Sequence, residues 1–181
     1  ESRLETEASG RTISRSMPKM ARNEMDREDL LREATALVDR AELTVNGESE
    51  PVVVGFRRDG AASFYFGADP VFQFNVRGEL RRGYLGGRLL KADGGRLVEM
   101  SRERTDAATT LLSRPIKDAE TDSIAESARE RLAMLSSALR AGQFSVVGQV
   151  SVDGRVVQRA LDWLEAMPAQ LRVAARPNVG G

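Results

Sequence analysis

The sequence predicts an α+β fold, in which helices pack on one face of an antiparallel β-meander of five to six strands. Three observations lead to this prediction. Between Ala62 and Arg104, apolar residues recur at a spacing closer to two than to 3.6. Glycine or aspartate interrupts this pattern every few residues, and connections this short force neighbouring strands to run antiparallel. After Thr105 the composition changes to alanine, serine and charged residues, Pro115 ends an extended piece, and the apolar residues that follow recur at helical spacing.

The expected strands are short and are separated by turn signals. A β-branched run opens after Pro51, and the Asp59-Gly60 pair that follows it favours a tight hairpin turn. Phenylalanines alternate with Gln73 and Asn75, which predicts one buried and one solvated sheet face. The predicted strands cover residues 52–56, 64–66, 71–76, 80–85, 89–90 and 96–100.

Three helices are expected around this meander. An N-terminal helix is predicted from Asp26 to near Leu43, before the Asn46-Gly47 turn. A long central helix should be capped by Asp118 or Thr121 and end at Gly142. One more strand, residues 144–150, and a short C-terminal helix complete the domain. Asp153 is the expected cap of that last helix, and Pro168 its end.

The length of the chain fits one domain with extensions. Residues 24–168 are expected to form a single α+β domain. Residues 1–23 are expected to be a disordered leader, because the stretch from Ser9 to Asn23 is basic, polar and free of acids. Residues 169–181 are expected to fray.

Composition excludes several classes of chemistry. The chain has no cysteine and no histidine, so it lacks the residues of thiol and imidazole catalysis and the commonest ligands of zinc. No cofactor or bound metal is predicted. The 27 basic residues are balanced by 27 acidic ones, so any attraction to an anionic partner must be local. No apolar run approaches the roughly 18 residues that a membrane span needs, and a cytoplasmic protein is expected.

The strongest candidate for a binding site is the basic side of the meander. Arginine side chains interleaved with tyrosine are suited to contact phosphates and to stack on bases or sugars. The competing interpretation is that these side chains pair with neighbouring carboxylates on a solvated face. Strand alternation places Arg81 and Arg82 on opposite faces, so only some of the set can share a patch. The candidate anion-binding residues are Arg77, Arg81, Arg82, Arg88, Lys91 and Tyr84.

Carboxylates provide a second candidate site. If several of them converged at one end of the sheet, they could hold a divalent cation or supply an acid/base pair. The competing interpretation is that they are ordinary residues of turns and exposed strand faces. The acids concerned are Asp69, Glu79, Asp93, Glu99 and Glu103.

The apolar stripe of the central helix has two interpretations. It is formed by Ile124, Leu132, Leu135 and Leu139, with Ala128 between them. The stripe either covers the sheet, as is common in an α+β domain, or binds a protein partner or a second copy of the chain. Trp163, the only tryptophan, is expected to be a packing residue.

These observations favour a non-catalytic binding or assembly module, because the easiest routes to catalysis are missing. Two alternatives remain. One is a metal-dependent or carboxylate-based enzyme acting on a phosphorylated or nucleic-acid substrate. The other is a sequence-tolerant nucleic-acid binder that uses the arginine-rich sheet face.

Overall fold

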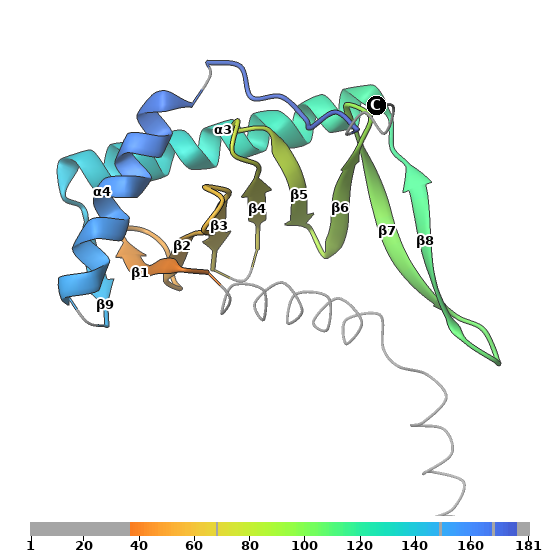
Figure 1. Ribbon diagram of the computed structural model, residues 1–181, viewed down its shortest axis with the longest axis horizontal. Helices are drawn as coiled ribbons and strands as arrows, with labels where there is room; N and C mark the ends of the chain where they lie inside the picture. Colours follow the sequence, from red (N-terminus) through yellow and green to blue (C-terminus); the bar gives the residue numbers. More distant parts are fainter. Residues whose placement is uncertain (1–36, 68, 149, 168, 177–181) are drawn as a thin grey trace, which may run out of the picture.

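The computed structural model describes residues 37–67, 69–148, 150–167 and 169–176. In these residues, nine strands form one antiparallel sheet and two helices pack on it (Figure 1). The α+β class and the antiparallel sheet are confirmed, with more strands than the five or six expected. The strands are β1 (Asp39–Val45), β2 (Val52–Phe56), β3 (Ala62–Phe66), β4 (Val71–Phe74), β5 (Leu80–Leu85), β6 (Arg88–Asp93), β7 (Arg96–Arg104), β8 (Thr109–Pro115) and β9 (Phe144–Val147); the helices are α3 (Asp118–Ala141) and α4 (Val150–Ala166).

Strand order follows chain order from β1 to β8, and each strand is antiparallel to the one before. The exception is β9. After α3, the chain returns to the free side of β1 and pairs Val146 with Leu43. The sheet is therefore open, with β8 as one edge and β9 as the other.

The main core lies between the sheet and the two helices. Strand register aligns Ala41, Val54, Phe64 and Phe72 in one row across four strands, and all four are buried. The helix α4 lies over β1 and β2, and its Trp163 packs on Phe64 at a ring-centroid distance of 5.2 Å. The prediction that Trp163 is a packing residue is confirmed. No helix in the described part of the chain is long and apolar enough to cross a membrane.

The stripe of α3 belongs to this core. Ile124, Leu132, Leu135 and Leu139 are at most 5% exposed, and they join the same cluster as the phenylalanines of the sheet. The stripe therefore covers the sheet, as the first of its two interpretations expected. It cannot also offer these buried side chains to a partner or to a second copy of the chain.

The ends of α3 match the sequence prediction at one terminus only. Gly142 closes the helix in the left-handed conformation, with φ of 67°, as predicted. At the other end, the N-cap position is Lys117, which makes no side-chain capping bond. Asp118 and Thr121 are already helical, so neither is the cap. The acids of the first turn still favour the helix through its dipole.

The chain start differs most from the prediction. Residues 39–43 were assigned to the end of an N-terminal helix, but the structure places them in β1. Ala41, Leu43 and Val45 are buried and alternate with less buried residues, which is a strand pattern. The earlier part of that predicted helix and the predicted leader, residues 1–23, lie outside the described residues.

The last strand and helix are also shifted. The strand expected over residues 144–150 ends at Val147, and α4 begins at Val150. Asp153 lies inside α4 and so is not its cap. Val156 and Ala160 face the core as predicted.

The alternation of residues predicted that the second face of the sheet would be solvated. Part of that face is instead buried. Tyr65, Val71 and Tyr84 are adjacent in the strand register and are buried together. Leu37 packs on this face so closely that a methyl group at Gly55 would overlap it, since the nearest carbon would lie 2.0 Å away. Any larger residue at position 55 would therefore require the Leu37 side chain to move.

The C-terminal segment is fixed to the sheet. Its residues 172–174 form a parallel bridge with the start of β5, where Leu80 exchanges backbone hydrogen bonds with Arg172 and Ala174 at 2.8 and 2.9 Å. The N–H of Gly95 in the β6–β7 turn donates to Ala174 at 3.3 Å. Residues 172–174 are thus bonded to the sheet, whereas the sequence predicted fraying over residues 169–181; residues 177–181 lie outside the described residues.

Candidate functional site

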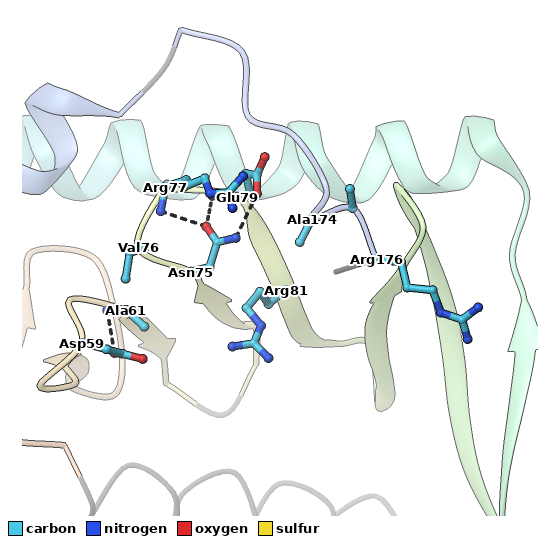
Figure 2. A pocket seen from close by; sticks show the side chains of 10 residues that line it. Asp59, Ala61, Asn75, Val76, Arg77, Glu79, Arg81, Ala174 and Arg176 are labelled. Carbon is cyan, nitrogen blue, oxygen red and sulfur yellow. Dashed lines mark hydrogen bonds between the residues drawn. The ribbon is translucent and has the colours of Figure 1, made fainter. Parts of the chain in front are cut away.

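A groove opens at one end of the sheet, where the β2–β3 turn, the β4–β5 turn and the C-terminal segment meet (Figure 2). Its volume is about 730 Å³, in the range of pockets that hold small ligands. The chemistry of the lining is mixed. Three arginines, Arg77, Arg81 and Arg176, share the lining with two acids, Asp59 and Glu79, and with alanines 61, 174 and 175.

The β4–β5 turn shapes one wall of the groove through Asn75. The side-chain oxygen of Asn75 accepts hydrogen bonds from the backbone N–H groups of Arg77 and Glu79, both at 3.0 Å. Its amide group donates to the Glu79 carboxylate at 2.9 Å. Asparagine is suited to this work because its short side chain can bond to the backbone two residues ahead. The turn is fixed from within, and Arg77 extends from it (Figure 2).

A β-bulge sets the position of Arg81. Gln73 pairs with Arg82 and Phe74 pairs with Leu80, so one step along β4 corresponds to two steps along β5. Arg81 is the extra residue. The strict alternation that predicted opposite faces for Arg81 and Arg82 therefore does not apply at this position, and Arg81 lines the groove.

Some of the charged side chains of the groove have hydrogen-bond or ion-pair partners, and others have none among the described residues. Arg176 pairs with Asp93 at 3.3 Å, and Glu79 is held by Asn75. Asp59 accepts a hydrogen bond from the Ala61 N–H at 3.1 Å. By contrast, neither Arg77 nor Arg81 has a side-chain partner within the described ranges, and both are exposed. Two guanidinium groups are thus available to an anion.

The structure separates the other predicted anion-binding residues from this pair. Arg88 lies between β6 and α3, where it bonds to Glu120 and pairs with Glu99 at 3.1 Å. Its hydrogen bonds, first to Glu120 and then to Glu99, raise the pKa of Arg88 above its usual value. Its charge is committed to joining sheet and helix.

Lys91, Arg82 and Tyr84 also lie outside the groove lining. Lys91 is exposed on β6 and pairs across the strands with Arg82, which is half-buried. Tyr84 is 5% exposed and belongs to the apolar cluster of the second sheet face. Its ring is therefore not a stacking platform on the surface. Of the six predicted residues, the groove brings together two, Arg77 and Arg81.

The predicted acids are distributed over both ends of the sheet. Asp69 accepts hydrogen bonds from the backbone N–H groups of Gly86 and Gly87 at 2.6 and 3.3 Å, at the end opposite the groove. Glu103 pairs with Arg114 at 3.2 Å near the β7–β8 turn. No group of three acidic side chains in the described ranges is placed to hold a metal ion. The convergence that the enzyme alternative required is not observed there.

Sequence reasoning missed most of the groove. The Asn75-Val76-Arg77-Gly78 run carries a usable signal, because an asparagine side chain often organises a turn by bonding to the backbone N–H two residues ahead. Asp59 is the acid of a predicted hairpin turn. Nothing in the local sequence places residues 174–176 beside them, since that contact depends on the path of the whole chain.

Comparison with known proteins adds no family or homologous fold to this description: no protein-family model, curated protein or solved structure matches the chain. The functional argument therefore depends on the site itself.

Proposed function

We propose that this chain is a non-catalytic binding module whose groove takes the oxyanion of a ligand, phosphate or carboxylate, between Arg77 and Arg81. The observation that carries the proposal is that Arg77 and Arg81 both line one groove, and neither side chain has a partner in the described residues. Guanidinium groups match the planar, bidentate geometry of both oxyanions.

The neighbouring acids support this assignment. A free arginine beside a free carboxylate would normally form an ion pair and leave no site. Here Glu79 accepts a hydrogen bond from the amide of Asn75, and Asp59 lies 4.0 Å from the guanidinium group of Arg57. Among the described residues, neither acid forms an ion pair with Arg77 or Arg81. The positive charge therefore remains directed to solvent, where a ligand can reach it.

The rest of the lining favours a ligand with an apolar part next to its anionic group. Ala61 and Ala174 are buried in the lining, and Val76 is 59% exposed beside them. Val76 also packs near the β2–β3 turn, where a methyl group on Gly60 would lie 3.7 Å from it. Contact with these side chains would remove apolar surface from water and add to the attraction of the charges.

The test is an NMR titration of the ¹⁵N-labelled full chain with inorganic phosphate and, separately, with acetate. Saturable shifts are expected at the Arg81 side chain and at the amides of residues 75–79. In the Arg81→Gln variant, the apparent Kd should rise at least about tenfold, because a charge-assisted hydrogen bond is worth roughly 1.5–3 kcal/mol. Whichever anion binds more tightly identifies the ligand class.

The matched control is Lys91→Gln, which removes the same charge from an exposed strand position outside the groove. It should leave the affinity for both anions within about twofold, since exposed charges at a distance are screened by salt. Equal weakening by Arg81→Gln and Lys91→Gln would contradict a localised site.

The same two variants also test the alternative function, in which the arginine-rich sheet face binds nucleic acid. A labelled single-stranded oligonucleotide bound along an extended arginine face should lose affinity in both variants, with a steep dependence on salt. An oligonucleotide bound only through the groove should respond to Arg81→Gln alone. The outcome separates an anion-binding groove from a basic sheet face.

A further inference from the structure

One edge of the sheet, β8, is long, exposed and chemically unprotected. Six of its seven residues are exposed, and Leu111 keeps 59% of its surface in contact with solvent. Residues 107–113 carry no charge, in a chain in which 30% of residues are charged. Natural sheets usually protect an edge with lysine, proline, a bulge or a covering element. On β8 such protection is confined to the last two residues, the charged Arg114 and Pro115.

The other edge is managed differently. β9 has four residues, is followed directly by α4, and lies beside that helix. A strand that short offers few backbone groups for pairing. The two edges of the sheet therefore differ in length and cover, and within the described part of the chain β8 is the edge with unused pairing capacity.

The register shows which backbone groups of β8 are unused. In the β7–β8 turn, the N–H of Thr105 donates to the carbonyl of Ala108 at 2.9 Å. The ladder then runs without a bulge from the Arg104–Thr109 pair to the Val98–Pro115 pair. Antiparallel pairs alternate between hydrogen-bonded and non-bonded, so the residues that do not bond β7 are Thr109, Leu111, Ser113 and Pro115. Proline has no N–H, which leaves an outward-facing trio of Thr109, Leu111 and Ser113.

We propose that this trio pairs with the same trio of a second copy of the chain, antiparallel and about a two-fold axis at Leu111. In that register Leu111 faces Leu111 of the second copy, and Thr109 faces Ser113. Each facing pair exchanges two backbone hydrogen bonds. The two sheets become one continuous sheet.

A second copy suits this edge because the segment is complementary to itself. Thr110 would lie opposite Leu112, and no like charges meet anywhere in residues 107–113. Two-fold symmetry is the commonest arrangement of homo-oligomers, and a strand that pairs with itself satisfies it directly. The contact is small, so the dimer should be weak and should depend on protein concentration.

The first test is sedimentation of the full chain over a wide range of concentration. A monomer–dimer equilibrium is expected. Ser113→Pro removes one outward-facing N–H but no hydrogen bond to β7. This variant should therefore lose the dimer, while the urea midpoint of its unfolding should stay nearly unchanged. Ser113→Thr, which keeps that N–H, is the control and should still dimerise. A wild-type chain that stays monomeric at every concentration would overturn the proposal.

The second test fixes the register. The chain has no cysteine, so Leu111→Cys introduces a single thiol on the proposed axis. Facing residues of a bonded antiparallel pair have Cα atoms about 5.5 Å apart, within disulfide range. Leu111→Cys should therefore oxidise to a covalent dimer. Thr109→Cys alone should not, but it should cross-link when mixed with Ser113→Cys. Equal cross-linking by every single-cysteine variant would overturn the register.

Discussion

β3 and β8 are both regular antiparallel strands of one sheet, yet all five residues of β3 are buried and six of the seven in β8 are exposed. Both strands take part in antiparallel ladders, but β3 is paired on both sides, with β2 and β4, whereas β8 is an edge strand paired only with β7. The cover differs as well, because the helices pack over β1 to β6 and the start of β7, while the far ends of β7 and β8 extend beyond them (Figure 1). Burial of side chains, and not strand pairing alone, should therefore set the local stability of this sheet.

The largest difference in stability between the covered core and the exposed strand β8 is expected when a buried leucine under the helices is truncated. Leu132→Ala removes a side chain that is 1% exposed in the main core, which should cost about 2–5 kcal/mol of unfolding free energy. Leu111→Ala removes the same atoms from an exposed position and should cost less than about 0.5 kcal/mol. Urea denaturation of both variants at low protein concentration measures the difference. Similar losses in the two variants would contradict the comparison.

A smaller effect is expected for the ion pairs of the covered region. Arg88 joins β6 to Glu120 of α3 and also contacts Glu99 of β7, and all three side chains are about one-third exposed. A double-mutant cycle with Arg88→Met and Glu120→Gln should give a coupling of about 1 kcal/mol after allowing for solvent screening. A coupling near zero would mean that the network orients α3 without stabilising it.

The smallest effect is expected for the matching pair on the exposed ribbon. Glu103 of β7 and Arg114 of β8 lie 3.2 Å apart, but more than half of each side chain is exposed to solvent. A cycle with Glu103→Gln and Arg114→Met should give a coupling below about 0.5 kcal/mol, reduced further by salt. If this coupling exceeded that of Arg88 and Glu120, burial would not be what distinguishes the two regions.

Part of this fold could be predicted because local pattern and tertiary environment agree. In α3, Leu132 and Leu135 recur at helical spacing and Gly142 marks the end, and no competing pattern is present. β1 fails this condition. Ala41 fits a helical face that starts upstream, but Ala41 and Leu43 also alternate with Arg40 and Glu42 as strand residues do. Pairing with β2 and β9 decides between the two, and pairing is not visible in the local sequence.

The candidate site was predictable to a smaller extent. The sequence identified a basic segment, but it could not show that Arg88 would be used by α3 or that a bulge would redirect Arg81. Both depend on elements distant in the chain or on a one-residue irregularity of register. Residue type predicted the charge of the site, whereas long-range packing determined which charges remain available.

The docking of residues 172–174 beside Leu80 has a consequence for the order in which the molecule can assemble. During synthesis from the N-terminus, β5 is made long before the segment that bonds to its first residue. In the same way, β1 is made long before β9, the strand that pairs with its outer side. The nascent sheet therefore keeps two incompletely paired strands until the C-terminal part of the chain has emerged. These contacts carry a large loop-closure cost and should form late, so a chaperone that shields open strand edges would act before them.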